Sequence, residues 1–343
     1  MIKNKHIIVI RLSAMGDVAM TVPVIRAFVE QHPDVKITFV SKGFLKPLFE
    51  DIKNVSFFSA ETDKKHKGFL GLYRLFSELK QLNPTHIADL HNVLRSKIVR
   101  TFFRLSGYPV AFIDKGRAEK KALTRTKNKV FKQLKTSHQR YADVFEKLGF
   151  PIALSNPMPI KKPQLNNIIT SLTGEKTSKW IGIAPFAAFA SKVYPLDLME
   201  KVIKELSEKN YKVLLFGGKS DATLLEPLAE KYQNVISVAG KLGGLKNEID
   251  LISNLDLMLS MDSGNAHFAA MQQVKTITLW GGTHPYAGFA PFNQPNDYCI
   301  LPDLEKYPNL PCSVYGNKIC DGYEDVMRSI TPKKVVDKIT SIL

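Results

Sequence analysis

A chain of 343 residues is long enough for two α/β domains of roughly 150 residues each. Apolar residues make up 44% and charged residues 23%, which excludes a disordered chain because burial of this much apolar surface can offset the entropy lost on folding. No apolar run reaches the roughly 18 residues of a membrane-spanning helix, and Arg11 and Asp17 interrupt the N-terminal apolar stretch. We therefore expect no signal peptide and a cytoplasmic protein.

The net charge of +16 comes entirely from the N-terminal half. Residues 1–165 contain 30 Lys and Arg against 13 Asp and Glu, whereas residues 166–343 contain 18 against 19. The densest segment, Lys115–Lys135, has nine basic residues and one acid. Such a surface indicates an acidic partner: a phosphorylated acceptor, an anionic membrane surface or a nucleic acid. A solvated basic surface that only keeps the protein soluble is the alternative.

The N-terminal half begins with a strand, a helix and a second strand, which implies a right-handed parallel crossover. β-branched runs predict strands at residues 6–12, 35–41 and 85–91. A helix is expected over residues 18–31, with a kink at Pro23 because proline lacks the amide hydrogen of a helix interior. A basic helix is expected over residues 92–105.

The C-terminal half alternates strands and helices more regularly, which is typical of a doubly wound parallel sheet with helices on both faces. Strands are expected at residues 179–186, 211–218, 234–240, 255–261 and 275–282, and helices at residues 195–209, 221–232, 245–255 and 265–273.

A proline-rich stretch at residues 155–167 separates the halves and predicts a linker. We expect a basic, Rossmann-like domain over residues 1–160 and a second Rossmann-like domain over residues 168–325. The helix at residues 326–343 is expected to pack back on the N-terminal domain. Ligands of such sheets bind beyond the carboxyl ends of the strands, so two facing domains would form a central cleft.

Cys299, Cys312 and Cys320 are few, odd in number and close to the C-terminus. They argue against a disulfide framework and fit a reducing compartment. A cysteine-only zinc site would need a fourth ligand.

Three segments follow strands at the edge where a ligand is expected. The first is SAMGD, residues 13–17, in which Gly16 permits close approach of the backbone and Asp17 stands at the start of a helix. Asp17 is either a helix cap or a base. The residues expected on this side are Ser13, Ala14, Met15, Gly16, Asp17 and Arg95.

The second segment is MDSGNAH, residues 261–267, where amides at a helix start favour an anion such as a diphosphate. It lacks the G-x-G-x-x-G and Walker A spacings, which disfavours nicotinamide, flavin and P-loop nucleotides. A capped turn is the alternative. The third segment, residues 185–195, carries Lys192, which can neutralise a phosphate. The residues expected to line a ligand site on this side are Lys192, Gly218, Asp262, Ser263, Gly264, Asn265, Ala266 and His267.

Together these segments resemble glycosyltransferase family 9, the ADP-heptose:lipopolysaccharide heptosyltransferases. The segments follow the family's order from about residue 6 to residue 339. They are RLSAMGDVAMTVPVIRAF, SKVYP, VAGKLGGLKNEIDLISNLDLMLSMDSGNAHFAAM, ITLWGGTHP and PCSVYGNKICDGYEDVMRSITPKKV.

The resemblance implies the GT-B architecture, with the nucleotide sugar on the C-terminal domain and the acceptor on the N-terminal one. It implies inversion at the anomeric carbon without a required metal or cofactor, with Asp17 as general base, and with Lys192 and residues 262–267 on the diphosphate. The implied donor is ADP-heptose and the implied acceptor is a lipopolysaccharide core or lipid A glycolipid, reached from the inner face of the cytoplasmic membrane.

Two features depart from the family pattern. Asn265 and Ala266 stand where members often carry Pro or Leu, and Lys219 stands where related members often have an acid for the ribose. The nucleoside is therefore less well defined than the chemistry, and another nucleotide sugar and glycan acceptor stay open. A non-catalytic sugar-nucleotide binder would not depend on Asp17. A nucleic-acid binder is disfavoured because Phe131 is the only aromatic residue within Lys115–Lys135.

Overall fold

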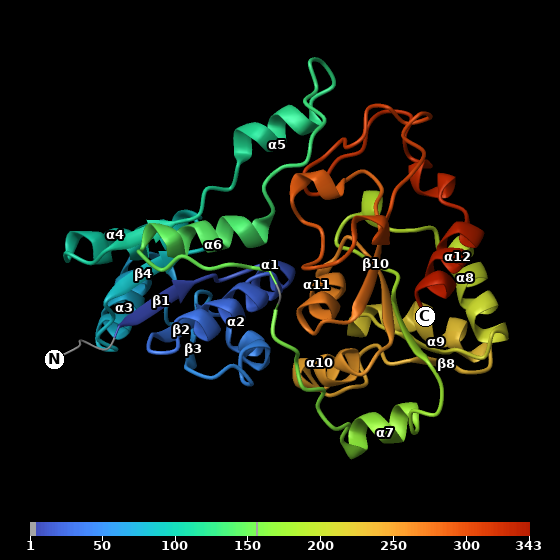
Figure 1. Cartoon of the computed structure of the whole chain (residues 1–343), viewed down its shortest axis with the longest axis horizontal. Helices are drawn as coiled ribbons and strands as arrows, with labels where there is room; N and C mark the ends of the chain where they lie inside the picture. Colours follow the sequence, from blue (N-terminus) through green and yellow to red (C-terminus); the bar gives the residue numbers. More distant parts are fainter. Residues whose placement is uncertain (1–4, 156) are drawn as a thin grey trace. The chain divides into compact units, whose positions relative to one another are not determined.

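The computed structural model describes residues 5–155 and 157–343. The chain divides into two compact units. The first comprises Met1–Lys115 and Ser137–Met158, and the second comprises Gly116–Thr136 and Pro159–Leu343. Each unit is built on its own parallel β-sheet (Figure 1).

The first unit contains a five-stranded sheet in the order β3-β2-β1-β4-β5. All of its neighbouring strands run parallel, and β1 lies in the middle between β2 and β4. The order reverses beside β1, which creates a switch point between the ends of β1 and β4. The strands are β1 (His6–Ile10), β2 (Lys36–Ser41), β3 (Val55–Ser59), β4 (His86–Asp89) and β5 (Val110–Phe112).

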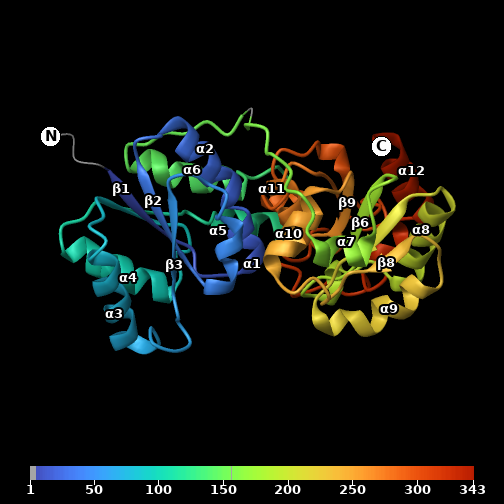
Figure 2. The same cartoon turned by 90° about the horizontal axis from the view of Figure 1, so that it is seen from below.

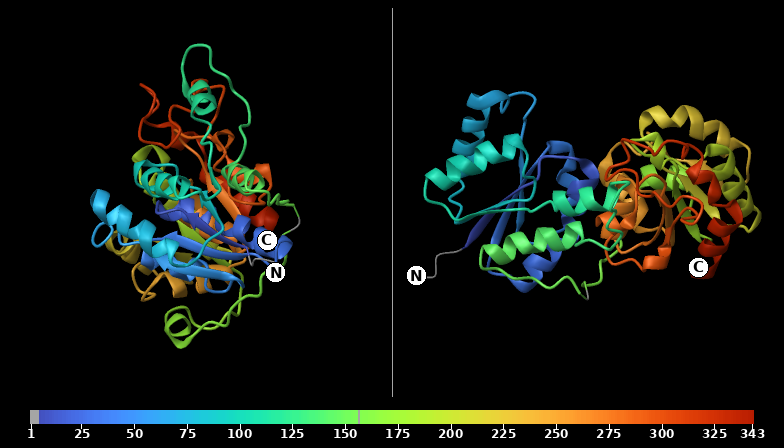
Figure 3. Two further views of the ribbon diagram at one scale, coloured as in Figure 1. Left: turned by 90° about the vertical axis from the view of Figure 1, so that its left-hand side faces the viewer. Right: turned by 90° about the horizontal axis from the view of Figure 1, so that it is seen from above.

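Helices cover both faces of this sheet, with α2 and α6 on one face and α3 and α4 on the other (Figures 2 and 3). The face of α3 that meets the sheet carries Leu72, Leu75, Phe76 and Leu79, which recur at helical spacing and are buried. The helices are α1 (Met15–Ala19), α2 (Val22–Gln31), α3 (Gly68–Lys80), α4 (Leu94–Leu105) and α6 (Ser137–Lys147), with a 3₁₀ segment at Gly43–Leu48.

The expected kink at Pro23 is a complete break. The helix α1 ends at Ala19 and α2 begins at Val22, so Pro23 lies in the first turn of a new helix. Proline is well suited to that position because the first-turn amides have no intrahelical acceptor. The short α1 therefore stands alone directly after β1.

The second unit contains a six-stranded parallel sheet in the order β11-β10-β9-β6-β7-β8. Its switch point lies between β6 and β9, where the doubly wound rule places a ligand. The strands are β6 (Trp180–Ala184), β7 (Lys212–Leu215), β8 (Val235–Ser237), β9 (Leu257–Met261), β10 (Lys275–Leu279) and β11 (Cys299–Ile300). The helices are α5 (Arg117–Thr124), α7 (Asn167–Thr173), α8 (Leu196–Glu208), α9 (Ala222–Glu230), α10 (Leu245–Ser253), α11 (Gly264–Met271) and α12 (Pro332–Ile342). Short 3₁₀ segments occupy Ala190–Lys192, Lys219–Asp221, Pro285–Ala287, Asn296–Tyr298 and Val326–Ser329.

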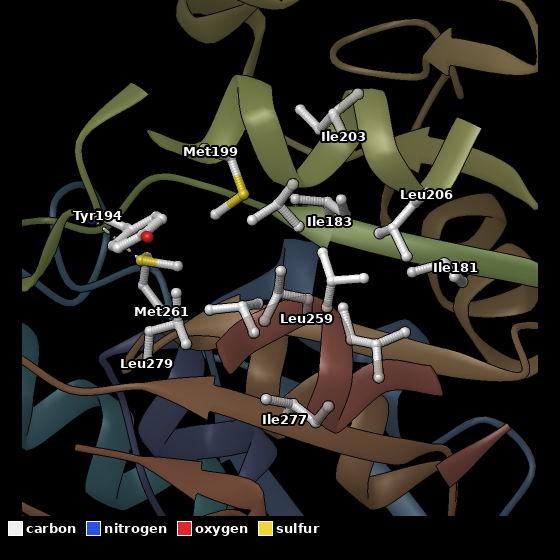
Figure 4. Packing of buried hydrophobic residues seen from close by; sticks show 14 of the residues in the cluster. Ile181, Ile183, Tyr194, Met199, Ile203, Leu206, Leu259, Met261, Ile277 and Leu279 are labelled. Atoms are coloured by element: carbon white, nitrogen blue, oxygen red, sulfur yellow. Dashed lines mark hydrogen bonds between the residues drawn. The ribbon is translucent and has the colours of Figure 1, made fainter. Parts of the chain in front are cut away.

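The core of the second unit lies between its sheet and α8. Met199, Ile203 and Leu206 of α8 point onto Ile183 and Leu259 of β6 and β9, and all five are fully buried (Figure 4). This packing fixes the two central strands, whose carboxyl ends carry Lys192 and Asp262 on the following loops.

The C-terminal helix belongs to the second unit. The sequence predicts that it packs on the N-terminal domain, but α12 buries Val335, Val336 and Ile339 in the core of the second unit and contacts α8. Those three apolar residues recur at helical spacing, and α8 offers them a neighbouring apolar surface.

The basic segment Gly116–Thr136 also groups with the second unit rather than with the first. Its apolar residues Leu123 and Leu134 are buried against Ala287. The amide of Leu134 donates to the carbonyl of Tyr286 at 2.9 Å, and Lys129 Nζ donates to the carbonyl of Asn309 at 2.7 Å. The few apolar side chains of this segment therefore decide where it packs, despite its charge.

Cys312 and Cys320 form a disulfide, and Cys299 is free. The sequence argues against a disulfide framework, and this single bond closes only a short loop. Within the described part of the chain, no helix combines the length and apolar character needed to span a bilayer.

Candidate functional site

The switch point of the second sheet carries a buried ion pair. Lys192 follows β6, Asp262 follows β9, and Lys192 Nζ lies 2.9 Å from Asp262 Oδ2. Their side chains are only 13% and 8% exposed. The hydroxyl of Thr283 donates to the same carboxylate oxygen at 2.9 Å. Asp262 thus holds the lysine ammonium at the edge of the sheet where a ligand is expected.

The first turn of α11 lies directly after Asp262. Ser263 is its N-cap residue, and the hydroxyls of Ser260 and Ser263 are 3.0 Å apart. Gly264 and Asn265 are partly exposed, whereas Ala266 and His267 are buried. The first amides of a helix have no intrahelical acceptor, so this end of α11 offers donors and the positive end of the helix dipole to an anion.

A loop from the C-terminal region encloses Lys192. The amide of Gly282 donates to the carbonyl of Ser191 at 2.9 Å, and Ser191 Oγ donates to the carbonyl of Gly316 at 2.5 Å. Gly316 has φ +85°, and a Cβ there would overlap the Lys192 stem. Only glycine fits this position, which lies within the loop closed by Cys312 and Cys320.

A separate pocket of about 240 Å³ lies at the carboxyl ends of β7 and β8. Its wall includes Gly218, whose amide donates to Asp221 Oδ2 at 2.7 Å, and Lys219. The remaining lining residues are apolar or glycine apart from Glu248: Phe216, Gly217, Val238, Gly240, Leu242, Gly243, Gly244 and Leu245.

In the first unit, Asp17 is held by a buried arginine. Arg11 Nη2 lies 2.5 Å from Asp17 Oδ2, with side-chain exposures of 6% for Arg11 and 33% for Asp17. The amide of Ala14 also donates to Oδ2, at 3.3 Å. Tyr141 Oη donates to the backbone carbonyl of Asp17 at 3.4 Å. The carboxylate is therefore fixed in position and still reaches solvent.

His91 follows β4 beside this pair, and its Nδ1 accepts a hydrogen bond from the amide of Leu12 at 3.3 Å. Burial, together with the nearby charge of Arg11, lowers the pKa of His91 to about 3. The imidazole is therefore neutral at physiological pH. Arg95 and Lys115 also act on His91 electrostatically, which places four charged side chains, counting Asp17, around it.

The predicted site residues fall into two groups, one in each unit. Ser13 and Ala14 precede α1, Met15 and Gly16 begin it, and all four are partly or fully exposed. Arg95 Nη1 contacts Thr62 Oγ1 at 3.3 Å. Lys192 and residues 262–267 come together at the second switch point, and Gly218 lines the separate pocket. Across the described residues, no cluster of three or more His, Cys, Asp and Glu side chains suits a metal ion.

Arg11, His91, Tyr141 and Glu248 were not singled out by the sequence. Arg11 directly follows β1 and His91 comes two residues after β4, so the strand-end rule could have found them. Tyr141 lies 124 residues from Asp17 and gives no local signal.

Comparison with known proteins identifies the family. The model of glycosyltransferase family 9 (heptosyltransferase) matches residues 72–316, which is most of the chain. The chain belongs to glycosyltransferase family 9. It is therefore a glycosyltransferase, and both the family and the enzyme class predicted from the sequence are confirmed.

Relatives of this family 9 chain cover most of its length. Lipooligosaccharide heptosyltransferase 2 of Haemophilus influenzae is 27% identical over 98% of this chain and 99% of the relative. Lipopolysaccharide core heptosyltransferase OpsX of the same organism is 24% identical over 84% of this chain and 82% of the relative.

Solved structures confirm the GT-B fold with two parallel-sheet domains. A family 9 glycosyltransferase from Veillonella parvula has a TM-score of 0.77 at 19% identity, covering 100% of this chain and 98% of that one. ADP-heptose lps heptosyltransferase II of E. coli has a TM-score of 0.69 at 18% identity, covering 98% of each chain. E. coli heptosyltransferase WaaC, solved with ADP, has a TM-score of 0.68 at 16% identity, covering 98% of this chain and 100% of that one.

Proposed function

We propose that this family 9 chain transfers heptose from ADP-heptose to a hydroxyl of a lipopolysaccharide core or lipid A acceptor, with inversion at the anomeric carbon. The observation that carries the proposal is the full-length likeness to lipooligosaccharide heptosyltransferases from several bacteria. ADP as the nucleotide is supported by the fold's likeness to a heptosyltransferase solved with ADP.

The donor diphosphate is proposed to bind at the start of α11. Lys192 supplies a point charge, and the amides of Gly264, Asn265 and Ala266 supply aligned dipoles. Negative charge grows on the diphosphate as its bond to the anomeric carbon breaks, and groups already in position stabilise that charge without reorganising. Because these groups provide the positive charge, the proposal requires no metal ion.

Asp17 is proposed to act as the general base on the acceptor. It takes the proton of the acceptor hydroxyl, whose oxygen bonds to the anomeric carbon from the face opposite the diphosphate, and ADP leaves. Arg11 and the amide of Ala14 both contact Oδ2. Since the described contacts of this carboxylate reach Oδ2, we assign the proton to Oδ1. Such a base typically contributes about 10² to 10⁴ in rate.

The acceptor's phosphate groups are proposed to meet the basic side chains around this carboxylate. Arg11, Lys115 and Arg95 all lie close enough to His91 to disfavour its protonation. The same positive potential would attract a phosphorylated glycolipid.

We also propose peripheral attachment to the anionic inner face of the cytoplasmic membrane through α3 and α4. Phe69, Leu70 and Leu105 are 64%, 81% and 81% exposed. Exposed basic residues, including Arg74 and Arg104, stand on the same helices. Apolar side chains beside basic ones are typical of surfaces that rest in a lipid headgroup layer. Co-sedimentation with vesicles of anionic lipid and not of neutral lipid would support this attachment, and a Leu70→Ser/Leu105→Ser variant should bind less.

Replacement of Asp17 tests the proposed chemistry. We expect Asp17→Asn to lower heptose transfer by about 10² to 10⁴ while ADP affinity is unchanged, because the base does not touch the donor nucleotide. Glu146→Gln changes an exposed carboxyl of the same unit and should leave transfer unaffected. Full activity of Asp17→Asn would remove this residue from the mechanism. A wild-type protein that binds ADP-heptose without transferring it to any acceptor would favour a sugar-nucleotide binder instead.

A further inference from the structure

The carboxyl group of Glu248 lines a pocket of the second unit without a protein partner among the described residues. Glu248 stands in the first turn of α10 and lines the pocket at the ends of β7 and β8. Its backbone amide donates to the carbonyl of Gly244 at 3.2 Å, whereas its carboxyl group forms no hydrogen bond or ion pair with any residue that the structure describes. Neighbouring acids are used within the protein: Asp250 receives Lys246 Nζ at 2.6 Å, and Asp221 receives the Gly218 amide at 2.7 Å.

Burial alone raises the pKa of Glu248 to about 7. Glu248 is half-buried, so desolvation disfavours its charged form, and titratable groups perturbed in this way gather at ligand sites. The cost is offset when a ligand donates a hydrogen bond to the carboxylate.

The pocket lies on the side of the sheet that a bound nucleotide would reach. Along the sheet, β9 and β6 carry Asp262 and Lys192, and β7 and β8 come next. Two strand spacings amount to about 10 Å, which is the scale of a nucleoside extending from its diphosphate. A diphosphate bound at the ends of β9 and β6 therefore places the nucleobase at the ends of β7 and β8.

Glycines shape this end of the pocket. Gly240, Gly243 and Gly244 all have positive φ, which side-chain-bearing residues rarely adopt, and they leave the backbone open to a flat ligand. Among the described lining residues, Glu248 offers the only side-chain acceptor and Lys219 the only side-chain donor. A nucleobase whose only exocyclic group is a hydrogen-bond donor would therefore suit the acceptor Glu248.

We propose that Glu248 selects the donor nucleoside by accepting a hydrogen bond from the exocyclic amino group of adenine. The inference rests on the proposed ADP-heptose donor and assigns the residue that reads its base. In uracil the one free ring N–H lies between two carbonyl groups, so their oxygens would face the carboxyl of Glu248 and repel it. Adenine offers an amino group without such repulsion.

Binding of three probes to three proteins tests the assignment. The proteins are wild type, Glu248→Gln and Glu248→Leu; the probes are ADP, purine riboside diphosphate, which lacks the amino group, and inorganic pyrophosphate, which lacks the nucleoside. We expect Glu248→Leu to weaken ADP binding about tenfold, as the loss of one hydrogen bond to a carboxyl would, and to leave the other two probes within about twofold. Glu248→Gln keeps an acceptor oxygen and should bind ADP nearly as well as wild type.

Two results would overturn the inference in distinguishable ways. Glu248 does not recognise the amino group if Glu248→Leu binds ADP as tightly as wild type, or if its affinities for ADP and purine riboside diphosphate fall by the same factor. Either result leaves the proposed ADP donor unaffected. If wild type binds pyrophosphate but prefers UDP or GDP to ADP, the proposed ADP donor fails together with the adenine contact. Thermal melting of each variant confirms that it is folded.

Discussion

Arg11 and Asp17 form a 2.5 Å ion pair that ties the end of the central strand β1 to α1. The second amino nitrogen of Arg11 donates to the carbonyl of Leu90, after β4, at 2.8 Å. One buried guanidinium therefore joins both strand ends of the first switch point to the carboxylate. Because Arg11 is only 6% exposed, it has little freedom to change partners, and Asp17 is held ready for an acceptor.

Arg11→Met should reduce turnover more than it reduces binding. Methionine keeps much of the apolar volume but releases Asp17 Oδ2, and misplacement of a reacting group by about 1 Å can cost about 10² in rate. We expect kcat to fall by that order while KM for the donor and ADP affinity stay unchanged. Steady-state kinetics with ADP-heptose measures the split. A loss of melting temperature with full kcat would show that Arg11 is structural only.

Lys192→Met should weaken binding of both ADP and pyrophosphate by about tenfold or more, because each loses the same charged contact. The variant also leaves the Asp262 carboxylate buried, with the Thr283 hydroxyl as its remaining described partner, so the melting temperature should fall. A double variant, Lys192→Met with Asp262→Asn, removes the unpaired charge. It should recover stability and still bind ADP weakly, and calorimetry separates the two effects. If the double variant recovers both its melting temperature and its ADP affinity, Lys192 stabilises the fold and does not bind the diphosphate.

The strand-end rule explains what the sequence could predict. Asp17, Lys192 and Asp262 each follow a parallel strand, and runs of buried residues such as those of β6 and β9 are recognisable without structure. Pro23 was interpreted as a kink within one helix because its position alone does not say whether the preceding turn ends.

The rest of the site depends on contacts between distant parts of the chain. Tyr141 reaches Asp17 across 124 residues, and Gly316 meets Lys192 from a loop with no regular structure. Glu248 lines a pocket and is half-buried, which no local sequence pattern reveals. The packing of α12 and of Gly116–Thr136 likewise depends on which apolar surfaces are nearest in the folded chain.

A Cys312→Ser/Cys320→Ser variant should bind ADP several-fold more weakly than wild type. The disulfide closes the short loop in which Gly316 contacts Lys192. Such a cross-link lowers the entropy of the unfolded chain and so adds about 2–3 kcal/mol to the free energy of unfolding. The melting temperature should therefore fall as well. Wild type treated with reductant should match the variant, and the variant itself should not respond to reductant. Equal ADP affinity in all three samples would remove the loop from the donor site.

Removal of the Glu248 carboxyl should stabilise the unliganded protein, and the gain should depend on pH. In the folded chain burial raises the pKa of Glu248 from 4.5 to about 7, so the folded state keeps a proton that the unfolded state has released. Between these two values the unfolded state binds fewer protons, and stability falls as pH rises. Below pH 4.5 the group is neutral in both states and costs little.

The melting temperature of Glu248→Leu should therefore exceed that of wild type by an amount that grows from pH 4.5 to 7 and is constant above it. Two other charged groups lie near Glu248: Lys219 lines the same pocket, and Lys246 pairs with Asp250 on the same helix. The Lys219→Met variant is a control that measures how far a neighbouring charge changes the pH dependence. Saturating ADP should shrink the difference between wild type and Glu248→Leu, since the base then partners the carboxyl in wild type alone. If the difference in melting temperature does not depend on pH or on ADP, the leucine acts through packing. The carboxyl of Glu248 then carries no desolvation cost in the folded protein.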